Sequence, residues 1–168
     1  MSELLDHVRE TLGEAVVDTH DALGDDTVVL RAEDLSESMQ TLRDGPGLGF
    51  NMLMDLTAVD YLGRQPRFEV VYHLASLDPE PHGVEPSRIR RRLRVKLGVP
   101  EVPAEVASVT SLWASANWLE REVWDMYGVR FTGHPDMRRL LLYEEFKGHP
   151  LRKDYPKERR QPLVGRNN

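Results

Sequence analysis

Residues 67–77 read Arg-Phe-Glu-Val-Val-Tyr-His-Leu-Ala-Ser-Leu, and a large apolar side chain recurs at every second position. The apolar set is Phe68, Val70, Tyr72 and Leu74. Because successive side chains of a strand point to opposite faces, this set lies on one face and the residues between it lie on the other. The stretch therefore predicts a half-buried strand, whose apolar face needs a second layer of structure.

The flanking segments continue this pattern on both sides. Residues 50–61 precede the strand and are separated from it by the turn-like sequence Gly63-Arg64-Gln65-Pro66. Downstream, residues 78–87 carry three prolines and one glycine, which predicts a loop, and residues 88–97 alternate again. Basic side chains at Arg92, Arg94 and Lys96 interleave there with Leu93, Val95 and Leu97. We expect three consecutive antiparallel strands.

The first third of the chain adds two more strands and two helices. Residues 15–19 and 27–32 are rich in β-branched side chains, and Gly24-Asp25-Asp26 between them predicts a hairpin. Residues 2–12 and 33–43 have apolar side chains at helical spacing. We therefore predict an α+β fold, with a mostly antiparallel sheet of four or five strands and helices packed on one side.

A third helix is expected after residue 116. Asn117 and Glu120 have the spacing of a capping box, in which each side chain bonds the other residue's backbone amide. Gly128 follows the apolar face and is a natural left-handed stop. Arg121 and Asp125 are one turn apart, so we interpret them as an ion pair on a solvated or partner-facing surface.

Composition divides the chain at residue 130. The chain has 168 residues and a net charge of −6, but residues 1–129 hold 12 basic and 23 acidic side chains, and residues 130–168 hold 10 and 5. Residues 130–168 also have weak periodicity and little apolar content. We predict an α+β domain over residues 1–129 and an extended, basic C-terminal arm over residues 130–168, which docks on a partner (the arm hereafter).

Patterns typical of enzymes or nucleic-acid binding are weak. The chain has no cysteine, which excludes disulfides, thiolate-bound clusters and thiol nucleophiles. His134 with Asp136, and His149 with Asp154, could be metal ligands, but no third ligand has suitable spacing. The basic run at residues 88–96 lacks interleaved aromatic side chains, so we interpret it as a solvated sheet face partly balanced by acids such as Glu69.

Other motifs point the same way. The sequence has no GxGxxG, P-loop or GxSxG pattern, and no apolar stretch approaches the 18 residues of a membrane span. The start of the chain lacks the basic and apolar regions of a signal peptide. Spacing alone therefore predicts no autonomous active site.

The second half of the chain closely resembles one family. Residues 120–141 read EREVWDMYGVRFTGHPDMRRLL, and residues 148–156 read GHPLRKDYP. Both stretches resemble the signature of the complex I "30 kDa" family, the C-type subunit of bacterial NADH-quinone oxidoreductase. Residues 50–61, 67–74 and 109–118 are similar to further segments of that family. The resemblance covers the chain from its first helix to about residue 156.

This resemblance implies a non-redox subunit in the peripheral arm of proton-translocating NADH:quinone oxidoreductase. It implies that the chain binds no cofactor, and that FMN, the iron–sulfur clusters, NADH and quinone are bound by other subunits. The implied partners are the large hydrogenase-like subunit (D type) and a cluster-bearing subunit (B type), with no nucleic acid. The implied location is the cytoplasmic side of the cell membrane, reached only through the complex.

The third helix and the arm supply the expected partner-binding residues. They are Glu120, Arg121, Glu122, Asp125, Gly128, Phe131, Gly133, His134, Pro135, Asp136, Arg138, Arg139, Gly148, His149, Pro150, Arg152, Lys153, Asp154 and Tyr155. The charged members are expected to form charge-assisted hydrogen bonds with a partner or to hold the arm itself.

Three alternatives stay open at this point. The same subunit type occurs in relatives of complex I that take electrons from ferredoxin, coenzyme F420 or hydrogen, and the electron donor would be bound elsewhere. The basic strand and arm could instead form an independent module that binds nucleic acid or acidic proteins. A small hydrolase using the carboxylates of the third helix is the remaining interpretation.

Overall fold

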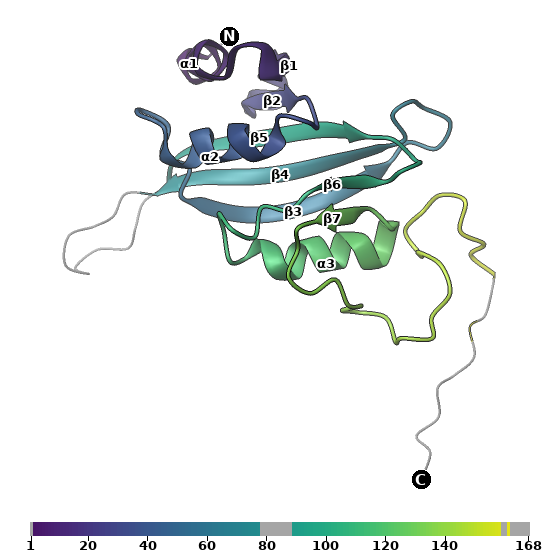
Figure 1. Ribbon diagram of the computed structural model, residues 1–168. Helices are drawn as coiled ribbons and strands as arrows, with labels where there is room; N and C mark the ends of the chain where they lie inside the picture. The colour runs from purple at the N-terminus through teal and green to yellow at the C-terminus, as the bar shows by residue number, and fades with distance from the viewer. Residues whose placement is uncertain (1, 78–88, 159–160, 162–168) are drawn as a thin grey trace.

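The computed structural model of the chain describes residues 2–77, 89–158 and 161 and has a five-stranded sheet at its centre (Figure 1). The strands lie in the order β1-β2-β5-β4-β3. Their bounds are Val16–His20 for β1, Thr27–Leu30 for β2, Met52–Asp60 for β3, Phe68–Leu77 for β4 and Ile89–Val99 for β5. The predicted loop at residues 78–87 lies outside the described residues. The predicted α+β class is confirmed.

Strand β4 occupies an inner position of the sheet, as its apolar pattern requires. It pairs antiparallel with β3 on one side and with β5 on the other, and Tyr72 lies opposite Leu56 and Val95. The side chain of Tyr72 is fully buried. The predicted strands at residues 50–61, 67–77 and 88–97 thus match the three long strands of the sheet within a few residues.

Strand β2 gives the sheet its one parallel pairing. The predicted hairpin of β1 and β2 is present, with Thr19 opposite Val28. The chain then passes through α2 before it enters β3, and β2 lies beside the later strand β5, with Thr27 opposite Arg94 and Leu30 opposite Leu97. Because β2 and β5 run in the same direction, the sheet is mixed.

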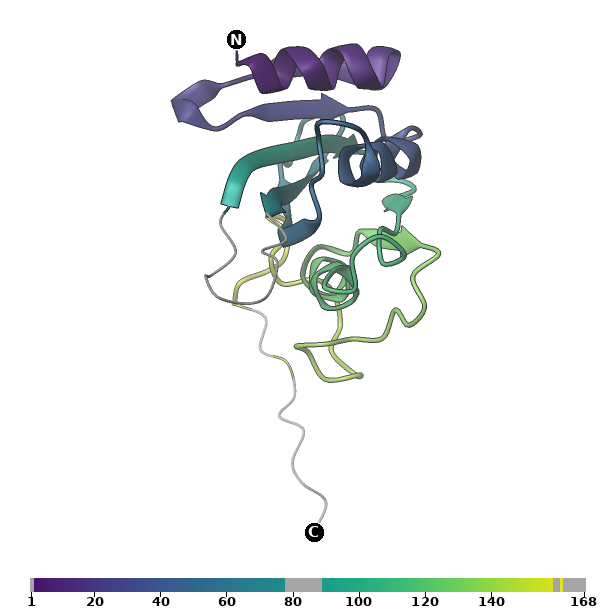
Figure 2. The same cartoon turned by 90° about the vertical axis from the view of Figure 1, so that its left-hand side faces the viewer.

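The helices pack on one face of the sheet. Their bounds are Glu3–Leu12 for α1, Leu35–Asp44 for α2 and Ala116–Tyr127 for α3, with short 3₁₀ turns at Gly13–Ala15 and Ala22–Gly24. Figure 2 shows α2 and α3 on the same side of the strands. Leu5, Met39 and Val123 from the three helices join Tyr72 in one hydrophobic core. On the other face Lys96 Nζ lies 3.0 Å from Glu69 Oε1, which confirms the expected charge balance.

The arm begins with a short strand that belongs to the folded body. Strands β6 (Glu105–Ala107) and β7 (Arg130–Thr132) pair in parallel, with Val106 opposite Phe131. Phe131 is 1% exposed and lies in the core. From residue 133 onward, the described part of the arm has no helix or strand. None of the described helices is long and apolar enough to cross a membrane.

Candidate partner-binding surface

The start of α3 differs from the prediction. The helix begins at Ala116 after Ser115, and the predicted capping box is wrong. Asn117 lies inside the helix, and its backbone carbonyl is bonded by the His134 ring at 3.0 Å. Glu120 turns inward and bonds another segment of the chain. A capping box is local, and here the hydrogen bonds of Glu120 with another segment replace the local one.

Glu120 is a fully buried carboxyl that ties α3 to the segment after β6. Ser108 Oγ donates to its Oε2 at 2.7 Å, and the Val109 N–H donates to its Oε1 at 2.7 Å. Burial disfavours the charged form and raises the pKa of Glu120 to about 7, although both hydrogen bonds oppose the shift. The buried Tyr72 hydroxyl has no hydrogen-bond partner within the described residues. Burial raises the pKa of this hydroxyl, and the negative charge of Glu120 raises it further.

The carboxylate of Asp125 accepts several hydrogen bonds from the first part of the arm. The backbone N–H groups of Leu140, Leu141 and Leu142 donate to its Oδ2 at 3.1, 2.9 and 2.9 Å. Arg139 Nη1 donates to its Oδ1 at 2.6 Å. Burial alone would raise the pKa of Asp125, but these four hydrogen bonds outweigh burial and lower it. The predicted pairing of Asp125 with Arg121 is therefore wrong.

Arg121 and His134 fix the path of the arm along α3. Arg121 donates from Nε and Nη2 to the backbone carbonyls of Arg138 and Arg139, at 3.0 Å each. The His134 Nδ1 accepts from the Asp136 N–H at 2.9 Å, so His134 Nε2 donates to Asn117. Both ring nitrogens of His134 are thus occupied by backbone groups.

The arm also completes the C-terminal end of α3. The last carbonyls of a helix lack partners within the helix. Here the carbonyl of Asp125 is bonded by the His149 ring, that of Met126 by the Leu151 N–H, and that of Tyr127 by Arg152 Nε. Because a carbonyl only accepts, His149 Nδ1 carries the proton, and burial lowers the pKa of this ring.

Gly128 permits this close approach. It adopts the predicted left-handed conformation, with φ 76°, and its N–H donates to the Trp124 carbonyl. A Cβ at position 128 would lie 2.6 Å from side-chain atoms of both Arg152 and His149. Glycine is therefore required here for its backbone conformation and also for the space that the arm occupies.

A buried arginine anchors the far part of the arm to the sheet. Arg67 donates from Nε and Nη2 to both oxygens of Asp60, at 2.9 and 2.8 Å, and both side chains are buried. It also bonds Glu101 at 2.6 Å and Asp154 of the arm at 2.8 Å. The Lys153 N–H donates to Asp60 Oδ2 at 2.8 Å. The guanidinium of Arg67 holds the pKa of Asp60 and of Asp154 below the ordinary value.

Sequence reasoning missed Asp60, Arg67 and Glu101. Asp60 and Arg67 are seven residues apart, but Glu101 lies 34 residues beyond Arg67, and no helix or strand spacing links the three. One signal was available, because Asp60 ends a strand pattern at a position where an apolar side chain would be expected to alternate. A charged side chain at a buried strand position requires a partner, and Arg67 is the first residue of the next strand pattern.

The structure separates the predicted partner-binding residues into three groups. Glu120, Asp125 and Phe131 are buried within the chain. The second group holds the arm on the body and consists of Arg121, His134, Arg139, His149, Arg152 and Asp154. Tyr155 stacks on Phe146. The third group is exposed and consists of Glu122, Gly133, Pro135, Arg138, Gly148 and Lys153. Of the remaining residues, Asp136 pairs with Arg138, and Gly128 and Pro150 are half-buried.

Several large apolar side chains on this side of the molecule face solvent. Trp118 is 61% exposed on α3, with the Arg121 guanidinium 5.3 Å from its ring centre. Leu141 and Leu151 of the arm are 61% and 51% exposed. Exposed apolar side chains near held polar groups are typical of a protein interface. Within the described residues, no three His, Cys, Asp or Glu side chains lie close enough together to hold a metal ion.

Comparison with known proteins identifies the family. The model of a family described as respiratory-chain NADH dehydrogenase, 30 Kd subunit, matches residues 28–161. The C-type subunit of NADH-quinone oxidoreductase from Geobacter metallireducens is 44% identical over 162 residues, which are 95% of this chain and 93% of that protein. The C-type subunit from a Roseiflexus species is 45% identical over 153 residues, which are 91% and 82% of the two chains.

Solved structures show the same fold. A structure titled as the trypsin-resistant fragment (1-134) of Nqo5 is 37% identical, with a TM-score of 0.64, and covers 80% of this chain and 99% of that one. A chain of an archaeal respiratory membrane complex, the membrane-bound sulfane sulfur reductase, has a TM-score of 0.72 at 21% identity, over 93% and 85% of the two chains. At that identity the second likeness concerns the fold alone.

The fold and the arm held along its third helix thus define a respiratory-complex subunit of the α+β type. The chain belongs to the family of 30 kDa subunits of respiratory-chain NADH dehydrogenase. It is a peripheral-arm subunit of NADH-quinone oxidoreductase (complex I), which is a multi-subunit oxidoreductase associated with the membrane.

Proposed function

We propose that this chain is a non-redox scaffold of the complex, and that α3 and the arm form its docking surface for the large hydrogenase-like subunit and a cluster-bearing subunit. The observation that carries this proposal is the exposure of Trp118 on α3 and of Leu141 and Leu151 on the arm, which Asp125 and Arg67 hold to the body. A folded monomer gains nothing from displaying these side chains, whereas an interface buries them.

The chemistry of the chain supports a role without electron transfer. It contains no cysteine, so it offers no thiolate to an iron–sulfur cluster. The buried carboxyls Glu120, Asp125 and Asp60 are all occupied by hydrogen bonds within the chain, which argues against the hydrolase interpretation. We place FMN, the clusters, NADH and quinone in other subunits, and the complex at the cytoplasmic side of the cell membrane.

NADH is the electron donor that the names of the curated relatives favour, since they are NADH-quinone oxidoreductase subunits. The related complexes with ferredoxin, F420 or hydrogen as donor are the second candidate. Purification of the complex through a tag on this chain, under mild detergent, separates the two: a co-purifying flavin- and NAD-binding subunit supports NADH, and its absence supports the second candidate.

The docking surface is tested by Leu141→Glu. Its side chain is exposed, so the substitution leaves the isolated chain folded, but a charge at a buried interface position weakens assembly. We expect several-fold less complex to be recovered with the tagged variant, and normal electron transfer in each complex that forms. Val17→Glu is the matched control, because Val17 is 62% exposed on β1, away from α3. Full assembly of Leu141→Glu with lost electron transfer would contradict the scaffold role.

A further inference from the structure

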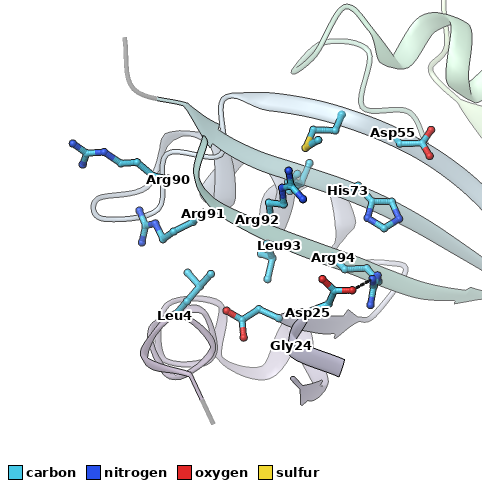
Figure 3. Close-up of a pocket in the computed structure, with 13 residues that line it drawn as sticks. Leu4, Gly24, Asp25, Asp55, His73, Arg90, Arg91, Arg92, Leu93 and Arg94 are labelled. Carbon is cyan, nitrogen blue, oxygen red and sulfur yellow. Dashed lines mark hydrogen bonds and ion pairs between the residues drawn. The ribbon is translucent and has the colours of Figure 1, made fainter. Parts of the chain in front are cut away.

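Strand β5 extends well beyond its neighbour β2. Strand β2 has four residues and pairs with β5 only from Arg94 to Leu97, whereas β5 has eleven residues and begins at Ile89. Within the described residues, the segment Ile89–Leu93 therefore has a neighbouring strand, β4, on one side only. On the other side lie the loop at Gly24–Asp26 and Leu4 of α1, and a groove of about 780 Å³ runs from them across β5 to His73 of β4 and Asp55 of β3 (Figure 3).

The backbone of this segment is oriented for pairing with another strand. The Arg94 N–H donates to the Asp26 carbonyl at 2.9 Å, so it points away from β4 and toward the β2 side. Backbone groups of a strand point to the same side at every second residue. The N–H and the carbonyl of Arg92 are therefore directed into the groove. Such an edge is a template for an added strand.

The side chains along this edge select the charge of an added strand. Arg90, Arg91 and Arg92 follow one another, and the exposed Arg92 has no ion-pair partner among the described residues. A second copy of β5 at this edge would place arginines opposite arginines, which is unfavourable. A strand with a glutamate or aspartate side chain beside Arg92 would pair with it, and Leu4 across the groove would contact the apolar positions of that strand (Figure 3).

We propose that the edge of β5 from Ile89 to Leu93 binds an extended acidic segment of a neighbouring subunit, which joins the sheet as an additional strand. Five residues of strand span roughly 16 Å, so the added segment is short. The proposal rests on the assembly of this chain into a complex, but it uses a surface distinct from α3 and the arm. A nucleic acid fits less well, because it has no peptide backbone to pair with the N–H and carbonyl groups of this edge.

Hydrogen exchange of the Arg92 amide tests the pairing directly. An added strand accepts a hydrogen bond from this N–H, so we expect at least tenfold slower exchange in the purified complex than in the isolated full-length chain. Equal exchange rates in the two samples would overturn the proposal while leaving the scaffold role intact. Absence of the chain from the purified complex would instead overturn the scaffold role.

Two substitutions separate the contributions of the Arg92 backbone and of the Arg92 charge to binding of the added strand. Arg92→Pro removes an N–H that β4 does not use, and Arg92→Glu reverses the charge. We expect each to leave the thermal unfolding of the isolated chain nearly unchanged and to lower its incorporation into the complex about tenfold. Arg64→Glu, the same charge change at an exposed arginine between β3 and β4, is the control.

Cross-linking from position 92 in the assembled complex identifies the occupant. A link to an acidic segment of another subunit is expected. A link to a second copy of this chain, to another part of the same chain or to nucleic acid contradicts the proposal.

Discussion

Asp125 of α3 and Arg139 of the arm form an ion pair, 2.6 Å from Oδ1 to Nη1, although they are fourteen residues apart and the carboxylate is fully buried. A buried carboxylate is tolerated only when it is paired and hydrogen-bonded. Three backbone N–H groups of the arm complete its shell. The conformation of the arm and the burial of Asp125 therefore depend on each other.

Asp125→Ala tests this dependence. The substitution leaves Arg139 and three N–H groups without their acceptor, so we expect the free energy of unfolding to fall by about 3–5 kcal/mol. Trypsin should then cleave the arm faster after Arg138, Arg139 and Lys147. Denaturant unfolding and timed proteolysis measure the two effects. Glu122→Ala on the exposed side of α3 is the control, and a similar loss in that variant would argue against a specific role of Asp125.

Gly128→Ala and Gly133→Ala form a second matched pair. Both glycines have positive φ, 76° and 83°, so alanine strains the backbone at each by roughly 1 kcal/mol. Only at position 128 does the new Cβ meet the arm, whereas nothing lies within 4 Å of it at position 133. We expect Gly128→Ala to be the more destabilising by at least about 1 kcal/mol in urea unfolding. Equal losses would mean that the arm does not pack against Gly128.

Arg67→Ala removes the partner of buried Asp60 and the anchor of Asp154. We expect a loss of about 3 kcal/mol or more in the free energy of unfolding, because an unpaired carboxylate remains buried. Addition of Asp60→Asn should recover part of that loss, which a double-mutant cycle measures. Strict additivity of the two substitutions would show that the pair is not coupled. Arg64→Ala, at an exposed arginine of the same turn, should cost little.

Glu120 makes stability depend on pH. Because burial raises its pKa to about 7, above the ordinary value of 4.5, the folded chain binds more protons than the unfolded chain between these values. The stabilising contribution of Glu120 is therefore fully present below about pH 4.5 and is lost as pH rises through 7. The free energy of unfolding falls by up to about 3 kcal/mol over this range. Unfolding in denaturant at a series of pH values measures this slope.

Glu120→Gln should abolish the slope that Glu120 causes. The amide oxygen still accepts from the Val109 N–H, and Ser108 Oγ can accept from the amide nitrogen, so the variant keeps both contacts. The difference in pH slope between wild type and variant measures the contribution of Glu120 alone. His149 contributes a slope of the opposite sign, because its lowered pKa costs stability as pH falls. The lowered pKa values of Asp60 and Asp125 act in a separate window, where stability is lost as pH falls below about 4. An unchanged slope in Glu120→Gln would show that folding does not raise the pKa of Glu120.

Local patterns predict the elements of this fold well. The period of two at residues 67–77 identifies β4, and its neighbours follow from the same alternation and from the turns between them. Gly128 ends α3 as predicted, because a left-handed stop is a local property of the backbone. The parallel pairing of β2 with β5 was not predicted, since a period of two is equal in parallel and antiparallel strands and the sequence distance between them is large.

The polar contacts of α3 were predictable only in part. Helical spacing correctly places Arg121 and Asp125 one turn apart, but the spacing does not reveal that the arm brings three N–H groups and Arg139 to the same carboxylate. A surface ion pair contributes little, so the buried arrangement with four donors prevails. The burial of Glu120 was missed for the same reason, since its partners are Ser108 and Val109 of another segment.

The hydrogen bonds and ion pairs that hold the arm also reduce the positive charge that the arm presents to other molecules. Arg139 faces a carboxylate, Arg152 lies at the negative end of the α3 dipole, and Arg138 is paired with Asp136. Part of the positive charge counted in the sequence is therefore neutralised internally, and within the described residues of the arm Arg130 and the lysines at 147, 153 and 157 are exposed. Attachment at the proposed docking surface should accordingly depend less steeply on ionic strength than the ten basic side chains of residues 130–168 suggest, because part of their charge is already paired within the chain.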